Sequence, residues 1–124
     1  MLAFDVENGF WWPDWGERPS KPEERAEVLK DALGRVSRLI PLYFHRFIPE
    51  TPHERGNPVF SMHGFDTIYY GANLADYFER EFHPERFRGV PLRTGVRHIP
   101  FWSDIAEQFD LAYAYYEATN GDAR

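Results

Sequence analysis

The sequence predicts an α+β domain with a mostly antiparallel sheet backed by helices. Three observations lead to this prediction. Short stretches with strand-like composition follow one another in the middle of the chain, stretches with helical periodicity flank them, and turn residues separate the two kinds. The 124 residues are the usual size of one domain, and 43% of them are hydrophobic. Residues 1–124 are therefore expected to fold as a single domain around one core.

The first predicted elements are a short strand and a helix. Residues 2–6 have the composition of a strand, and a turn dipeptide follows them. Ser20 and Glu23 have the spacing of a capping box, which predicts a helix that ends at about Val36. Four apolar residues lie on one face of this helix at helical spacing, which indicates the side that packs on the core. They are Leu29, Ala32, Leu33 and Val36.

The middle of the chain predicts consecutive strands. Residues 39–48 are apolar on both faces over most of their length, which is typical of a buried strand. Pro41 argues against a central position for the first half of this strand, because proline cannot donate a ladder hydrogen bond. Residues 59–63 and 67–70 are predicted as two further short strands, joined by a tight turn at 64–66.

Two more helices are predicted after the strands. Asn73 is a suitable N-cap for the first, and Pro84 ends it. Its expected buried stripe consists of Leu74, Tyr77, Phe78 and Phe82. The second is predicted over about 102–119. One of its faces would carry Trp102, Ile105, Phe109, Ala112, Tyr113 and Tyr116.

Composition and charge exclude several classes of function. The net charge of −6 disfavours binding to nucleic acid and would suit a basic partner. The absence of cysteine excludes disulfide and zinc–thiolate chemistry. The N-terminus does not resemble a signal peptide, and no apolar run is long enough to span a bilayer. A cytoplasmic protein without a membrane partner is expected.

Ser61, His63 and Asp66 lie within six residues and raise the question of a catalytic triad. A serine nucleophile needs a base within hydrogen-bond reach, an orienting carboxylate and an oxyanion hole. The sequence around Ser61 lacks the Gly-x-Ser-x-Gly elbow of α/β-hydrolases. The favoured interpretation is therefore a set of polar residues on a half-exposed strand, and no catalytic residue is assigned.

Histidines raise the possibility of a metal site. His45, His53 and His63, together with Glu54 or Asp66, would supply enough ligands for a divalent ion. Their spacing matches no metal-binding motif, so structural roles are favoured and no metal or cofactor is expected. A small metal-dependent hydrolase that uses these histidines remains the alternative function.

Arg46 and three tryptophans are the other notable residues. A guanidinium in a buried strand must find a carboxylate, and Asp66 and Glu50 are the candidate partners. Three tryptophans within five residues would either cap the edge of the core or form a patch for a protein partner. The candidate partner-binding or structural residues are Trp11, Trp12, Trp15, His45, Arg46, His63, Asp66 and Tyr70.

Several blocks of the sequence together resemble bacterial proteins of the SUKH superfamily, the Smi/Knr-like group. The order and spacing of the blocks extend the resemblance over nearly the whole chain. The blocks are residues 10–16 (FWWPDWG), 39–49 (LIPLYFHRFIP), 56–61 (GNPVFS), 66–77 (DTIYYGANLADY) and 99–103 (IPFWS).

The resemblance implies an α+β fold and a non-enzymatic role. Bacterial members are regarded as immunity proteins that bind and neutralise a toxin domain of a polymorphic or contact-dependent toxin system, and fungal relatives act as interaction scaffolds. The family has no generally assigned catalytic residues. Family members usually begin with a helix and a strand that this chain is expected to lack. Its first strand, at 2–6, would then be unpaired and could join two copies into a homo-oligomer.

Overall fold

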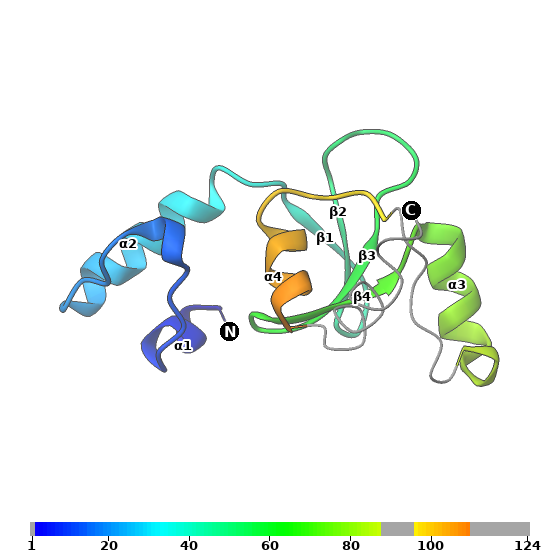
Figure 1. Ribbon diagram of the computed structural model, residues 1–124, viewed down its shortest axis with the longest axis horizontal. Coiled ribbons are helices and arrows are strands. Elements are labelled where there is room, and N and C mark those ends of the chain that lie inside the picture. Colours follow the sequence, from blue (N-terminus) through cyan, green and yellow to red (C-terminus); the bar gives the residue numbers. More distant parts are fainter. Residues whose placement is uncertain (1, 88–95, 110–124) are drawn as a thin grey trace, which may run out of the picture.

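The part of the chain that the structure describes contains a four-stranded sheet whose strands follow the order of the chain, each antiparallel to the next (Figure 1). The computed structural model describes residues 2–87 and 96–109. The strands are β1 (Leu39–Tyr43), β2 (Arg46–Pro49), β3 (Val59–His63) and β4 (Asp66–Gly71). This architecture, with the helices that accompany it, confirms the predicted α+β fold with an antiparallel sheet.

Helices precede and follow the sheet in the sequence. They are α1 (Leu2–Glu7), the 3-10 helix η1 (Pro13–Trp15), α2 (Pro22–Leu33), α3 (Leu74–Phe82), the 3-10 helix η2 (Pro84–Arg86) and α4 (Trp102–Phe109). Figure 1 shows the strands between α4 and α3, with α1 and α2 beyond α4. Within the described ranges, every helix is too short or too polar to cross a membrane.

The strand register determines which side chains face each layer. Phe60 lies opposite Phe47 on β2 and Tyr69 on β4, and these three residues share the face of the sheet that packs on α4. We call it the α4 face. Ser61 lies opposite Arg46 and Ile68 on the other face, which packs on α3. We call it the α3 face. The buried core on the α4 side contains Val6, Leu29, Phe60, Met62, Phe65, Tyr69, Ile99, Phe101, Trp102, Ile105 and Ala106.

The prediction of a strand at 2–6 is wrong, because these residues form α1. A helical turn places Leu2 and Val6 on the same side, and both contact the core. The Asp5 carboxylate accepts a hydrogen bond of 2.7 Å from the Phe65 N–H, in the turn between β3 and β4. Five residues are too few to distinguish the two periodicities. The strand on which the predicted homo-oligomer depended therefore does not exist.

The single buried strand predicted at 39–48 is also wrong. The segment forms a hairpin of β1 and β2, with a turn at Phe44 and His45 in which Phe44 has a φ of 49°. β1 is an edge strand and is mostly exposed, which agrees with the argument from Pro41 against a central position. An apolar run without glycine or asparagine gives no sign of such a turn.

The remaining elements follow the predictions with three exceptions. The helix predicted to end at about Val36 ends at Leu33. No side chain caps α2, whose N-cap is Lys21, so the Ser20 capping box does not form. Asn73 does cap α3, since its Oδ1 accepts a 2.8 Å hydrogen bond from the Asp76 N–H. Of the predicted buried stripe of α3 only Tyr77 is buried, and the other three residues are exposed. The predicted helix from 102 is present as α4, and its continuation over 110–119 lies outside the described residues.

Candidate functional site

The three tryptophans of the N-terminal segment are half-buried and pack against the core. Trp11 Nε1 donates a 2.7 Å hydrogen bond to the Gly16 carbonyl, which closes the loop around η1. The rings of Trp12 and Trp15 contact Phe101 at centroid distances of 5.7 and 6.1 Å. These contacts correspond to a cap over the edge of the core, the first of the two interpretations that the sequence allowed.

The structure does not assemble Ser61, His63 and Asp66 into a triad. The Ser61 hydroxyl is buried and accepts a 2.8 Å hydrogen bond from Arg46 Nη1. Among the described residues no hydrogen bond or ion pair joins Ser61 to His63, or His63 to Asp66. His63 and Asp66 are exposed neighbours at the ends of β3 and β4. Within the described ranges, the Ser61 side chain therefore has no hydrogen bond to a general base.

The histidines proposed as metal ligands are brought together only in part. The rings of His45 and His63 pack against each other with centroids 4.0 Å apart. His53 is exposed in the loop between β2 and β3, and the described residues contain no metal-binding group that includes any of the three. The two imidazole planes are tilted by 41°, and their arrangement is that of a ring contact between the β1–β2 turn and the end of β3.

Arg46 is at the centre of a polar cluster between the sheet and α3. Its Nη1 bonds Ser61, its guanidinium carbon lies 3.7 Å from the centroid of the Tyr70 ring, and its Nε lies 3.6 Å from Glu81 Oε1. The side chains of Arg46 and Glu81 are 19% and 14% exposed. An ion pair was predicted for Arg46, but its partner is Glu81 on α3 and neither Asp66 nor Glu50.

Glu81 also accepts hydrogen bonds from two tyrosines. Tyr70 donates to Oε2 at 3.1 Å and Tyr77 donates to Oε1 at 3.2 Å. Burial raises the pKa of Tyr77, and the neighbouring Glu81 carboxylate raises it further, since both oppose formation of the phenolate. The cluster therefore fixes α3 on the sheet.

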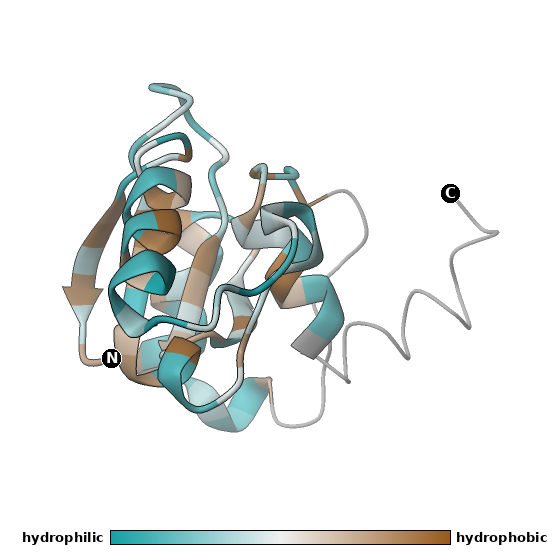
Figure 2. Ribbon diagram, turned by 90° about the vertical axis from the view of Figure 1, so that its left-hand side faces the viewer, coloured by the Kyte–Doolittle hydropathy of each residue, from teal (hydrophilic) through white to brown (hydrophobic). Residues whose placement is uncertain are grey.

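The outer strand of the sheet displays large apolar side chains to solvent. Tyr43 and Phe44 are 57% and 74% exposed, and their rings lie 4.2 Å apart. Ile40 and Leu42 are also exposed, and Figure 2 shows β1 coloured as hydrophobic along most of its length. We call Ile40, Leu42, Tyr43 and Phe44 the β1 surface. Exposed apolar side chains on an edge strand and its turn are typical of an interaction site.

A pocket of about 510 Å³ lies on the α4 face of the sheet, against the N-terminal helices. Its apolar lining comes from α1, α2, the sheet and α4. These residues are Leu2, Leu33, Leu39, Phe47, Met62 and Trp102. The volume is in the range of small-molecule sites, and the pocket is on the opposite side of the sheet from the Arg46 cluster.

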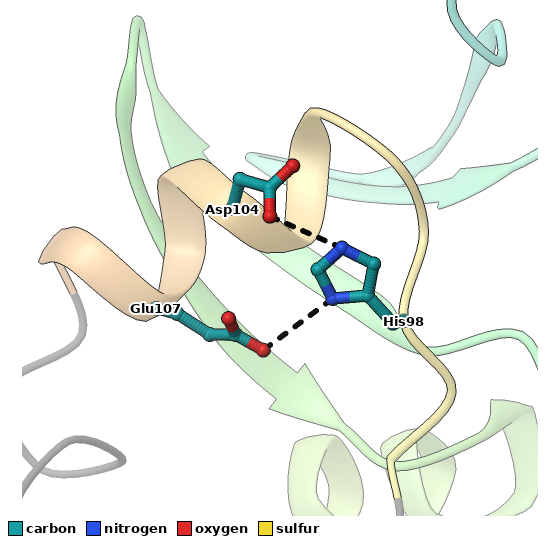
Figure 3. Close-up of side chains that lie close together, drawn as sticks. All are labelled: His98, Asp104 and Glu107. Carbon is teal, nitrogen blue, oxygen red and sulfur yellow. Dashed lines mark ion pairs between the residues drawn. The ribbon is translucent and has the colours of Figure 1, made fainter.

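His98 lies between two carboxylates of α4, as Figure 3 shows. Its Nε2 is 3.1 Å from Asp104 Oδ1, and its Nδ1 is 3.6 Å from Glu107 Oε1. The three side chains are exposed, and one ligand atom of each lies within 4.8 Å of the others. In the described part of the chain they are the one group of three that could hold a divalent ion.

Each member of this group already has a protein partner. Asp104 Oδ2 accepts a 3.0 Å hydrogen bond from the Phe101 N–H at the start of α4, and Glu107 Oε1 accepts one of 3.3 Å from the Tyr69 hydroxyl. The arrangement accounts for how α4 begins and joins β4, without a metal. Sequence reasoning missed it, because His98 is in a loop and the i, i+3 spacing of two acids on a helix is common.

No family model matches the chain, and no curated protein and no solved structure matches it. The geometry of its own residues is therefore the basis for a functional proposal.

Proposed function

We propose that this chain is a non-enzymatic protein-binding domain that docks its partner on the β1 surface. The observation that carries the proposal is the exposure of four large apolar side chains on the edge strand and its turn. Exposing such side chains to water costs free energy, and covering them with a partner recovers it. Among the described residues no strand pairs with the outer edge of β1, so a strand of the partner could pair with its main-chain groups.

The partner that fits is a basic protein. The chain has a net charge of −6, which would steer a cationic partner toward it and disfavour nucleic acid. The resemblance of the sequence blocks to SUKH proteins suggests the class of partner, a toxin domain. The proposed role is thus that of a cytoplasmic immunity protein that binds and neutralises a basic toxin of a polymorphic or contact-dependent system.

The experiment measures binding to the toxin domain encoded beside this gene, by calorimetry with purified proteins. Tyr43→Ser and Phe44→Ser together remove the two most exposed rings of the β1 surface. Aromatic side chains at the centre of an interface contribute about 2 kcal/mol or more each, so we expect affinity to fall at least 100-fold. Phe4→Ser is the matched control, because Phe4 is 68% exposed but lies on α1.

If the toxin binds the double variant of Tyr43 and Phe44 as tightly as it binds the unmodified protein, the β1 surface is not the docking site. Absence of binding between the unmodified protein and the toxin would overturn the immunity role. Equal loss of affinity in Phe4→Ser and in the double variant would also contradict the proposal, since α1 would then be part of the interface.

The alternative function, a small metal-dependent hydrolase, has less support. It requires His45, His53 and His63 to share an ion, whereas two of their rings pack on each other and the third is in an exposed loop. Metal analysis of the purified protein separates the two functions. Stoichiometric zinc or manganese that is lost in His45→Ala would favour the hydrolase.

A further inference from the structure

We propose that the pocket on the α4 face binds a small amphiphile with an apolar chain and an anionic head, such as a medium-chain fatty acid. Six apolar side chains from four different parts of the fold line the pocket, which has a volume of about 510 Å³. Such a pocket favours a ligand that buries hydrocarbon, at about 0.8 kcal/mol per methylene. This ligand site goes beyond the protein-binding role, and its lining includes none of the four residues of the β1 surface.

The polar residues of the pocket identify the head group. Arg38 is exposed, and its guanidinium has no hydrogen-bond or ion-pair partner among the described residues. His45 also lines the pocket, with its ring against His63. A free guanidinium binds a carboxylate in a bidentate manner, so an anion placed beside Arg38 would gain charge-assisted hydrogen bonds.

The other polar groups of the pocket argue against a sugar or a nucleoside. Ser37 Oγ donates to the Arg38 carbonyl at 3.1 Å and accepts from the Thr51 N–H at 3.0 Å. The Ser37 carbonyl accepts from Trp102 Nε1 at 2.8 Å. These groups are already satisfied, and a ligand with many hydroxyls would lose its hydrogen bonds with water on entering the apolar part of the pocket. One anionic end and an apolar body therefore fit best.

The test is a titration with dodecanoate below its micelle concentration, followed by calorimetry and by tryptophan fluorescence, because Trp102 lines the pocket. We expect saturable binding with one site. Decanoate, which has two fewer methylenes, should bind about 15-fold more weakly if each methylene is worth about fourfold in affinity. This comparison uses the unmodified protein, so it does not depend on the folding of any variant.

Two variants examine the head group. Arg38→Gln should weaken dodecanoate binding about tenfold, and dodecanol should bind both proteins equally. Arg35→Gln is the matched control, because Arg35 is close in sequence and exposed but pairs with Asp31 and does not line the pocket. We expect the affinity of Arg35→Gln for dodecanoate to stay within twofold of that of the unmodified protein.

Three results would overturn the proposal. They are no saturable binding of dodecanoate, affinity that does not depend on chain length, and equal weakening by Arg38→Gln and Arg35→Gln. A parallel titration with phosphatidylglycerol vesicles tests whether the protein binds an acyl chain in a membrane or a free fatty acid. Binding to vesicles without binding of free dodecanoate would indicate a membrane surface and would also contradict the pocket.

Discussion

Replacing Arg46 by methionine should destabilise the fold strongly. The substitution removes the hydrogen bond to Ser61, the contact with the Tyr70 ring and the ion pair with Glu81. Removing one partner of a buried ion pair costs about 3–5 kcal/mol, because the other charge is left uncompensated. Glu81 is 14% exposed, so it would carry most of this cost.

Two features of the cluster reduce the expected loss. The Arg46 side chain is 19% exposed, so part of its charge is already screened by water. Glu81 keeps the hydrogen bonds from the Tyr70 and Tyr77 hydroxyls when the guanidinium is removed. We therefore expect a loss of about 3 kcal/mol in the free energy of unfolding, at the lower end of the range. With an m-value of about 2 kcal/mol/M, the urea midpoint should fall by about 1.5 M.

A double-mutant cycle with Glu81→Gln separates the pair from general disruption. Arg46→Met should cost about 1–2 kcal/mol less in the Glu81→Gln background than in the unmodified protein. Arg35→Met is the matched control, because Arg35 is 77% exposed in its pair with Asp31 and should cost under about 0.5 kcal/mol. Additive effects of the two cluster substitutions, or equal losses in Arg46→Met and Arg35→Met, would refute this reasoning.

Three more perturbations test other parts of the fold. Gly71→Ala adds a Cβ 2.7 Å from the Tyr77 Cβ, so α3 must move away from β4, and urea denaturation should show a loss of about 2–3 kcal/mol. Arg25 donates two hydrogen bonds to Glu7 and lowers the pKa of that carboxyl, so the pair stabilises the fold above pH 4.5 and loses this effect as the pH falls through the lowered pKa. Arg25→Gln should therefore flatten the acid side of the plot of stability against pH. The raised pKa of Tyr77 means that stability falls as the pH rises above 10.0 and through that pKa, and Tyr77→Phe should remove a phenol whose titration is displaced to higher pH in alkaline absorbance measurements. Unchanged stability in Gly71→Ala, or unchanged pH profiles in the other two variants, would contradict these assignments.

The sequence was most informative where the pattern was local. The hairpin of β3 and β4 was predicted almost to the residue, because alternating apolar residues flank a turn at Gly64. The N-cap at Asn73 was equally clear, since a capping side chain bonds a backbone group three residues away. Both features depend on interactions that span only a few residues.

Features that depend on distant contacts were not predictable. Arg46 needed an acidic partner, but nothing in the sequence distinguishes Glu81 on α3 from the acids closer in the chain. The β1 segment contains enough apolar residues for a buried strand, and its exposure follows only from its place at the edge of the sheet. Residues of α1, α2, the sheet and α4 line the pocket, so the spacing of residues in the sequence predicts neither its volume nor its lining.

The hydrogen bond from Phe65 N–H to Asp5 has a consequence for the order of folding during synthesis. The two residues are 60 positions apart, so the Asp5 carboxylate on the first helix cannot reach its donor until the turn after the third strand has left the ribosome. Until then the Phe10 ring, in the aromatic loop that follows α1, has no Phe65 ring to stack on. In the finished fold the centroids of these two rings are 4.0 Å apart. The N-terminal segment is thus translated first and completed late, and in that interval its tryptophans lack their ring contacts with Phe65 and Phe101.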